Sequence, residues 1–282
     1  MRILVFGQSG QVAKELQRHP GVVTLSRDQA DLTDPSVCAA VIQAHDADAI
    51  INAAAYTAVD NAEGDAVIAE LINAKAPAAM AKAAAERGIP FVQISTDYVF
   101  DGAGTAPFSP NDATGPLGVY GATKLAGEHA VASAGGAHAI LRTSWVFSAH
   151  GKNFVKTMLR LAEARDHLTI VGDQIGGPTP ATDIASACVS IAKQLRSSPE
   201  KSGVYHFTGE ADVSWADFAR EIFRQSGKNV SVEDISTSSY PTPAQRPLNS
   251  RLNCSTTAQQ FDISRPDWRQ GLTQVLSALE EA

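Results

Sequence analysis

Cysteine is scarce in this sequence, and the cysteines present do not cluster. Cys38, Cys188 and Cys254 are far apart, and no C-x-x-C pair or Cys/His cluster occurs. A structural zinc site needs several such ligands together, so we expect no bound metal. An odd number of scattered thiols is typical of a reducing compartment. We therefore expect three free cysteines in a cytoplasmic protein.

Basic charge and long apolar runs are also missing. Lys and Arg together number 23 and Asp and Glu 30, which gives a formal net charge of −7. Proteins that neutralise nucleic-acid phosphates usually carry a basic face, so nucleic acid is not an expected partner. No apolar run approaches the length of a membrane span, and the four apolar residues 3–6 are too few for a signal-peptide core. A membrane partner is therefore not expected either.

Short apolar runs and Ala-rich stretches alternate in the first half of the 282 residues. Continuous apolar strands separated by helices are typical of a parallel sheet covered on both faces. We therefore predict an α/β fold, a doubly wound parallel Rossmann sheet with a small C-terminal α/β lobe that binds substrate. The expected strands are 3–6, 22–25, 49–52, 90–95 and 139–142, and the expected helices are 11–18, 35–44, 65–87 and 120–133.

The pattern changes after about residue 145. Helices are expected at 154–164, 183–195 and 215–225, and strands at 168–171 and 204–207. Residues 236–255 are rich in Ser, Thr, Pro and Asn, and we interpret them as a functional loop. We expect residues 1–145 to form a cofactor-binding Rossmann domain and residues 146–282 to form mainly the substrate lobe, with some segments returning to the Rossmann core.

A glycine-rich string follows the first strand and opens a helix. It reads G-x-x-G-x-x-A, with Gly7, Gly10 and Ala13 at the small positions. Glycine lets the backbone approach a pyrophosphate, whose charge the N–H groups of the helix N-terminus bind. A tight structural turn is the alternative. The residues predicted to hold the pyrophosphate are Gly7, Ser9, Gly10, Gln11 and Val12.

The end of the second expected strand indicates which dinucleotide binds. An acidic residue there would bond the free 2′-hydroxyl of NADH, whereas this chain has Ser26 and Arg27. A hydroxyl and a guanidinium suit a 2′-phosphate, which favours NADPH. Asp28 lies close enough to leave NADH as an alternative. Asp31 and Leu32 are expected beside the adenine.

Tyr120 and Lys124 begin a further expected helix. Residues four apart share a helix face, so the phenol and the ammonium group approach one site. We expect Lys124 to lower the pKa of Tyr120 from its usual value of about 10. A solvent-facing pair is the alternative. Thr96 directly follows the fourth expected strand, at the sheet edge where ligands bind in open α/β folds.

These motifs together resemble the extended short-chain dehydrogenase/reductase superfamily, with Thr96, Tyr120 and Lys124 as its catalytic triad. Longer strings are similar to one family within it, the dTDP-4-dehydrorhamnose reductases. The similarity runs from Met1 to about Trp268. The matching strings are residues 52–60, 95–102, 142–147, 151–154, 173–179 and 246–252.

The resemblance implies that NADPH reduces the 4-keto group of dTDP-4-dehydro-L-rhamnose, the last step of dTDP-rhamnose biosynthesis. It implies cofactor contacts from the first of the matching strings: Ala53, Ala54, Ala55, Tyr56 and Thr57. The residues that it implies for the small-molecule dTDP-sugar are Thr96, Asp97, Trp145, Asn153, Arg246, Asn249, Ser250 and Arg251. Of these, Arg246 and Arg251 would clamp the diphosphate, although a role as surface charges is the alternative.

Some features depart from the family or leave alternatives open. Gly118 stands before the catalytic tyrosine where many relatives have Asn. Some relatives form magnesium-linked dimers through glutamates, but only Glu15 has a comparable place here, so no magnesium is predicted and a monomer or a homodimer remains possible. Trp145 has core packing as an alternative role. Trp215 and Trp268 are expected in the core.

Two rival functions remain at this point. Asp97 beside the catalytic threonine is also typical of nucleotide-sugar epimerases and dehydratases, which recycle a tightly held NAD. The methionine adenosyltransferase β subunit, a cofactor-binding regulatory protein without turnover, looks similar as well. The intact triad argues against the second rival, and Ser26 with Arg27 argues against the first.

Overall fold

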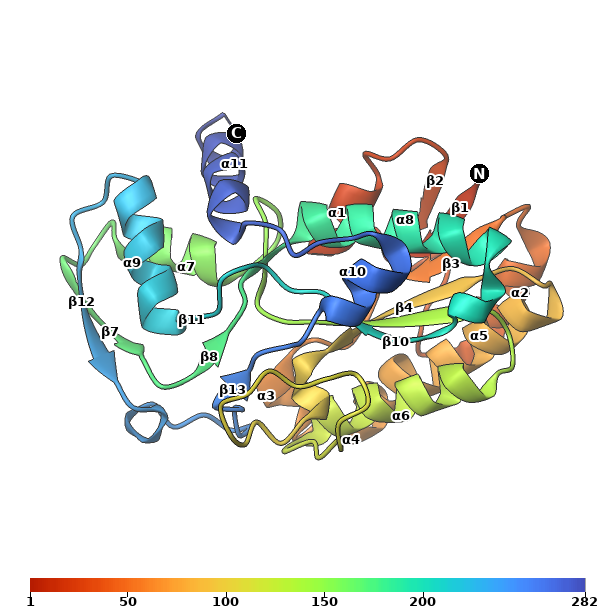
Figure 1. Ribbon diagram of the computed structural model, residues 1–282, viewed down its shortest axis with the longest axis horizontal. Coiled ribbons are helices and arrows are strands. Elements are labelled where there is room, and N and C mark those ends of the chain that lie inside the picture. The colour runs from red at the N-terminus through yellow and green to blue at the C-terminus, as the bar shows by residue number, and fades with distance from the viewer. Residues whose placement is uncertain (282) are drawn as a thin grey trace.

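A parallel sheet of six strands, in the order β10-β5-β4-β3-β1-β2, lies at the centre of the larger part of the molecule (Figure 1). The computed structural model describes residues 1–281. All five neighbouring pairs in this sheet are parallel, which confirms the predicted doubly wound fold. The strands are β1 (Ile3–Phe6), β2 (Val22–Leu25), β3 (Ala49–Asn52), β4 (Phe91–Thr96), β5 (His138–Thr143) and β10 (Gly203–His206).

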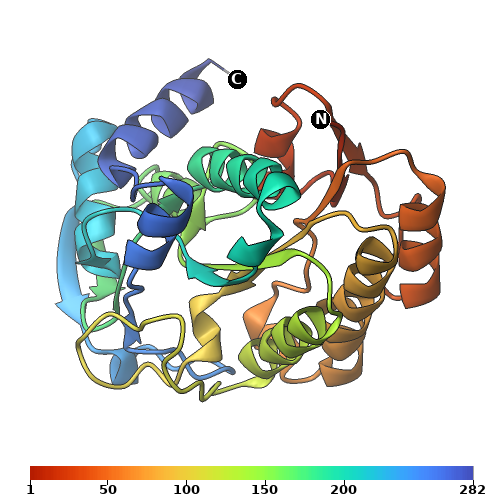
Figure 2. The same ribbon diagram turned by 45° about the vertical axis from the view of Figure 1, so that its right-hand side comes forward.

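Helices cover both faces of this sheet because each central strand is apolar on both sides. On β1, Ile3 and Val5 pack into the cluster that contains residues of α1 (Gln11–Leu16) and α8 (Ala181–Ser197). Leu4 and Phe6 pack into the opposite cluster. Figures 1 and 2 show the helices of that opposite face on the other side of the sheet. They are α2 (Pro35–Ala44), α5 (Ala76–Glu86) and α6 (Val119–Ser133).

The second half of the chain builds a smaller lobe beside the carboxyl edge of the sheet (Figure 1). Its core packs three helices against the parallel pair β7 (His167–Val171) and β12 (Ser231–Ile235). Trp268 is fully buried in this core, as expected. The three helices are α7 (Phe154–Leu161), α9 (Trp215–Gln225) and α11 (Trp268–Glu280).

Short strands join the lobe to the loops of the sheet. They form a three-stranded sheet in the order β11-β8-β13 and the pair β6-β9. Helix α10 (Ser255–Phe261) follows them. The strands are β6 (Val146–Phe147), β8 (Ile175–Gly176), β9 (Thr179–Pro180), β11 (Val213–Ser214) and β13 (Asn249–Ser250).

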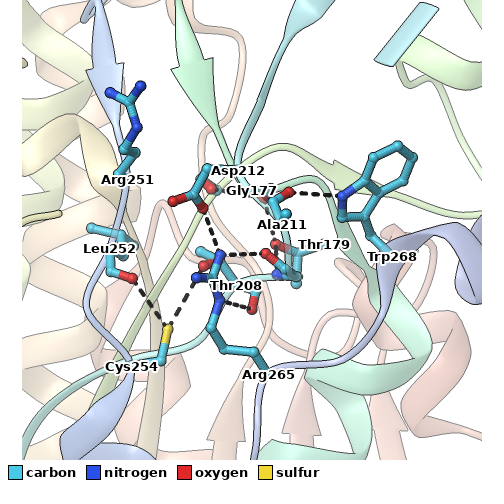
Figure 3. Close-up of polar contacts among 12 residues, drawn as sticks. Gly177, Thr179, Thr208, Ala211, Asp212, Arg251, Leu252, Cys254, Arg265 and Trp268 are labelled. Carbon is cyan, nitrogen blue, oxygen red and sulfur yellow. Dashed lines mark hydrogen bonds and ion pairs between the residues drawn. The ribbon is translucent and has the colours of Figure 1, made fainter. Parts of the chain in front are cut away.

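A cluster of polar contacts fastens residues 207–212 between the two parts. Arg265 donates from Nε to the Thr208 carbonyl at 3.3 Å and from Nη2 to Asp212 Oδ1 at 2.5 Å (Figure 3). Trp268 Nε1 donates to the Ala211 carbonyl at 2.8 Å. Cys254 is buried nearby, and all three cysteines are free, as expected. These donors are engaged with the chain itself, so we assign this cluster a structural role.

The expected helix at residues 65–87 is divided in the structure. It consists of α4 (Ala66–Glu70), a π-helical turn at Leu71–Lys75 and then α5. A four-residue helix, α3 (Val59–Ala62), precedes it and was not predicted, because four residues show no helical periodicity. The strand β12 was also missed, since it lies half-exposed in a polar stretch.

Two absences from the described part of the chain concern membranes and metals. Within residues 1–281, no helix is long and apolar enough to cross a bilayer. The same residues contain no group of three or more His, Cys, Asp or Glu side chains placed to hold a metal ion. Glu15 itself is buried and forms an ion pair with Arg18 at 3.0 Å.

Candidate active site

A cavity of about 920 Å³ lies at the carboxyl ends of the central strands, between the sheet and the smaller lobe. It is lined by most of the predicted site residues, which come from segments between Gly7 and Trp145, up to 138 positions apart in the chain. The predicted residues that line it are Gly7, Ser9, Gly10, Gln11, Val12, Ser26, Arg27, Asp31, Leu32, Ala53, Ala54, Ala55, Thr57, Thr96, Asp97, Tyr120, Lys124 and Trp145.

The glycine loop has the shape that a pyrophosphate requires. Gly7 has a φ of 106°, and a Cβ there would lie 3.3 Å from backbone atoms of Ala53 and Ala54. Gly10 is the extended N-cap of α1, and no side chain accepts from the first N–H groups of that helix. The loop therefore presents backbone donors to the cavity with no side chain in the way, which fits a dinucleotide.

Gln11 ties this loop to the beginning of the smaller lobe. Its Nε2 donates to the Val146 carbonyl at 3.4 Å, and its Oε1 accepts from Ser148 Oγ at 3.0 Å. Asn153, predicted to contact substrate, donates from Nδ2 to the same oxygen at 2.9 Å and caps α7 through Lys156 N. Asn153 is not among the residues that line the cavity. The structure thus places it behind the cofactor loop.

Arg27 and Asp31 lie together at the end of the cavity that is predicted to hold the adenosine. Arg27 Nε is 3.2 Å from Asp31 Oδ2, and three-quarters of the Arg27 side chain is exposed. Hydrogen bonds from Thr33 hold the pKa of Asp31 below its usual range, with a smaller lowering from Arg27. A ligand phosphate at this end would therefore meet a guanidinium that is open to solvent on most of its surface.

Tyr120 and Lys124 reach the cavity from the first turns of α6. Gly121 lets this helix come close, because a Cβ there would lie 2.1 Å from the carbonyl oxygen of Tyr98. The rings of Tyr98 and Tyr120 pack edge to face at 5.4 Å. Lys124 Nζ donates to the Ile94 carbonyl at 2.7 Å. The predicted helix-face pair therefore lies at one site rather than in solvent.

The pKa of Tyr120 differs from the sequence-based expectation. Burial raises it to about 12, the nearby Thr96 side chain lowers it, and Asp97 raises it further. The expected lowering by Lys124 is wrong for the protein on its own. Burial lowers the pKa of Lys124 to about 8, while Glu128 raises it. The phenol thus stays protonated at neutral pH, the state that a proton donor needs.

Asp97 carries an unsatisfied carboxylate oxygen. Its Oδ1 accepts from Thr96 Oγ1 at 3.1 Å, whereas its buried Oδ2 has no partner in the described chain. Burial raises the pKa of Asp97 to about 6, while the nearby side chains of Ser250 and Thr96 lower it. Because a buried acceptor is costly to leave unpaired, this oxygen fits a hydroxyl group of a bound ligand.

Two tryptophans form one wall of the cavity. Trp145 and Trp215 stack with ring centroids 3.6 Å apart, and Trp145 has a left-handed φ of 49°. Trp215 Nε1 donates to Gln174 Oε1 at 3.2 Å. Trp215 packs against the core of the smaller lobe, as predicted, and it also lines the cavity, which was not predicted. Its place at the start of α9, directly after the cap Ser214, was the available signal.

The residues predicted for the nucleotide end lie outside the cavity lining. Arg246 Nη2 pairs with Asp60 Oδ2 at 2.7 Å. Asn249 Nδ2 donates to the Ala106 carbonyl at 2.9 Å, and Arg251 Nη1 donates to Asn249 Oδ1 at 3.1 Å. These contacts hold the irregular loop together, and the role of these residues toward a ligand stays a prediction.

Two further residues complete the placement of the predicted set. The hydroxyl of Tyr56 donates to Asp65 Oδ2 at 2.6 Å, outside the cavity lining. Ser250, like its neighbours in the loop, does not line the cavity, but its side chain approaches Asp97. Lys152 lines the cavity and was not predicted to. Its position in a matching string was the only signal.

A buried ion pair fixes α6 against the sheet beneath the site. Arg142 on β5 bonds Glu128 on α6 through Nη2 at 2.6 Å, and both side chains are 4% exposed or less. Ser95 on β4 donates to Glu128 Oε1 at 2.5 Å. Tyr120, Lys124 and Glu128 recur every four residues, so they share one face of the helix.

Comparison with known proteins agrees with this geometry. Residues 1–281 match the family described as the RmlD substrate binding domain. A protein of Sinorhizobium fredii named dTDP-4-dehydrorhamnose reductase is 46% identical over 289 residues, covering 99% of this chain and 98% of the relative. The chain belongs to the dTDP-4-dehydrorhamnose reductase family.

Solved structures of the dTDP-4-dehydrorhamnose reductase family share the whole fold. The protein from Clostridium acetobutylicum superposes with a TM-score of 0.91 at 36% identity, covering 99% of this chain and 100% of that one. The protein from Bacillus anthracis, solved in complex with NADP, gives a TM-score of 0.91 at 33% identity, covering 98% and 99%. The likeness therefore includes both the sheet and the smaller lobe.

Removing the buried carboxylate should destabilise the fold. Glu128→Ala would leave Arg142 buried without its counter-charge, so we expect a loss of about 3–5 kcal/mol in the free energy of unfolding. Urea denaturation measures this loss. Glu163→Ala, at an exposed position, is the control and should stay within about 0.5 kcal/mol. A loss below about 1 kcal/mol in Glu128→Ala would contradict the proposed anchoring.

The raised pKa of Asp97 should make stability depend on pH. Between pH 3.8 and about 6 the folded protein holds this proton more tightly than the unfolded chain. The stability that the protonated form supplies is thus lost as pH rises through this range. Relative to the wild type, the free energy of unfolding of Asp97→Asn should therefore rise by up to about 3 kcal/mol between pH 4 and pH 7. Urea denaturation at each pH measures this difference. A pH-independent difference would be inconsistent with a raised pKa.

Proposed function

We propose that this protein reduces the 4-keto group of dTDP-4-dehydro-L-rhamnose to give dTDP-L-rhamnose, with NADPH as the reductant. The observation that carries the proposal is one cavity that joins an open glycine loop to Thr96, Tyr120 and Lys124. Membership of the dTDP-4-dehydrorhamnose reductase family supports the choice of substrate.

The residues at the cofactor end fit NADPH, which supplies a hydride to the sugar carbonyl carbon when bound. The backbone of the loop from Gly7 to Val12 would bind the pyrophosphate, and Ser26 with Arg27 would bind the 2′-phosphate. Lys124, buried beside the Ile94 carbonyl, would position the nicotinamide ribose. Arg27 favours NADPH over NADH, because a carboxylate rather than a guanidinium suits a free 2′-hydroxyl.

The other cavity residues act on the sugar. Negative charge develops on the keto oxygen during reduction, and Tyr120 donates a proton to it while Thr96 adds a hydrogen bond. The high pKa of Tyr120 keeps the proton on the phenol until the oxygen becomes basic enough to take it. Asp97 Oδ2 would accept from a sugar hydroxyl, and the tryptophan wall would contact the apolar side of the deoxysugar.

The remaining assignments form part of the same proposal. Residues 1–145 bind the cofactor and residues 146–282 mainly the sugar nucleotide. The partner is a small molecule rather than nucleic acid, because the net charge is −7. The three free, buried thiols support a cytoplasmic location.

An NADPH-oxidation assay with dTDP-4-dehydro-L-rhamnose tests the function. We expect one NADPH to be consumed for each sugar reduced. An epimerase or dehydratase would consume none, because these enzymes return the hydride to their own product. Tight NADPH binding without turnover on any dTDP-keto sugar would instead indicate a regulatory subunit.

The proton donor is tested by Tyr120→Phe. Loss of the phenol should lower kcat by roughly 10²–10⁴-fold, the usual contribution of general acid catalysis. Tyr205→Phe is the matched control, since the Tyr205 hydroxyl donates to the Lys201 carbonyl outside the cavity lining and its loss should leave kcat unchanged. A rate near that of the wild type in Tyr120→Phe would remove this assignment.

A further inference from the structure

The helix that carries Tyr120 begins without a cap of its own. Its N-cap is Gly118, which has no side chain to accept from the first N–H groups. The first N–H groups of a helix have no partner within the helix and need one from elsewhere. Tyr120 is the second residue of α6, so fraying of this first turn would displace the phenol.

Glu63 supplies an acceptor from another segment. It directly follows α3, 56 positions earlier in the chain, and its Oε1 accepts from the backbone N–H of Val119 at 2.9 Å. Its negative charge also lies at the positive end of the 15-residue helix α6, a favourable arrangement.

Gly118 and Glu63 fit each other closely. A Cβ at position 118 would lie 2.5 Å from Glu63 Oε1 and 3.6 Å from its Cδ, and it would meet nothing else within 4 Å in residues 1–281. The φ of Gly118 is −152°, which any residue adopts. A side chain at position 118 would therefore have to displace only the end of the Glu63 side chain.

A second set of contacts holds α3 in place through Asp60. Asp60 Oδ2 pairs with Arg246 Nη2 at 2.7 Å, and its Oδ1 accepts from Ala244 N at 3.2 Å. The short helix is thus fastened to the loop of residues 244–246 while Glu63 reaches α6. This attachment limits the motion of the Glu63 carboxylate, to which the Val119 N–H donates.

We propose that Glu63 is a positioning residue for Tyr120. Its carboxylate caps α6 from outside the helix and fixes the first turn, so that the phenol stays at the place of the reacting oxygen. The predicted effect on rate rests on the proposed function. The capping of Val119 does not.

Substitution of Glu63 tests the cap through rate and cofactor binding together. Glu63→Ala should lower kcat about 2–30-fold, the range expected when a helix cap is lost, and leave the Kd for NADPH unchanged. Glu63→Gln keeps an acceptor oxygen and should retain most of the rate. Equal kcat in wild type and Glu63→Ala, or a loss in Glu63→Gln equal to that in Glu63→Ala, would overturn the proposal.

Substitution of Gly118 provides a matched cycle. Gly118→Ala adds a Cβ that displaces Glu63 but brings no acceptor. It should therefore lower kcat as much as Glu63→Ala does, and the double variant should lower kcat no further than either single variant. Gly118→Asn brings its own capping oxygen. When Glu63→Ala is added to the Gly118→Asn variant, it should therefore have no effect. The proposal would be contradicted if the effect of Glu63→Ala on kcat were the same in the Gly118→Ala and Gly118→Asn variants as in the wild type.

Hydrogen exchange separates the cap from the activity. The amide of Val119 should exchange faster in Glu63→Ala than in the wild type, and Glu63→Gln should restore its protection. Unchanged exchange would refute the cap. If the wild type does not oxidise NADPH with the sugar, the proposed function fails, and exchange at Val119 still decides the role of Glu63.

Discussion

The ion pair between Glu128 and Arg142 is the interaction on which the site depends. It joins α6 to β5 inside the protein, and Ser95 adds β4 to the same carboxylate. A charge buried this deeply is tolerated only with a partner at close range. The pair therefore fixes the rotation and height of α6 on the sheet. With that geometry set, Tyr120 and Lys124, which precede Glu128 on the same face of the helix, reach the cavity.

The cavity also explains how an acidic protein accommodates anionic ligands. A net charge of −7 describes the whole chain, but the groups facing the ligand space include Arg27, Lys124 and Lys152 and the open backbone of the glycine loop. The unpaired acidic oxygen in the described wall belongs to Asp97, whose pKa is raised to about 6. Local placement rather than total charge thus determines what binds.

The fold and the cofactor end could be predicted because local sequence specifies them. Buried parallel strands show as short apolar runs, and the glycine loop must follow the first strand directly. The carboxyl ends of parallel strands meet at one edge, which brings residues far apart in sequence into one cavity. These features need no knowledge of long-range packing.

Other features depend on neighbours that a sequence does not reveal. The high pKa of Tyr120 comes from burial, which depends on long-range packing. The place of Trp215 in the cavity wall depends on stacking with Trp145, 70 positions earlier in the chain. The cap that Glu63 provides spans 56 positions, and the four-residue helix before it has no periodicity to detect.

The central claim is that this cavity directs a hydride to the C4 carbon of a dTDP-keto sugar. The most direct measurement follows deuterium from NADPH labelled at the transferable C4 position of the nicotinamide, with the sugar product analysed by NMR. The account predicts one deuterium at C4 of the rhamnose ring and none at other carbons. A product without deuterium, or with the label at another carbon, would contradict it.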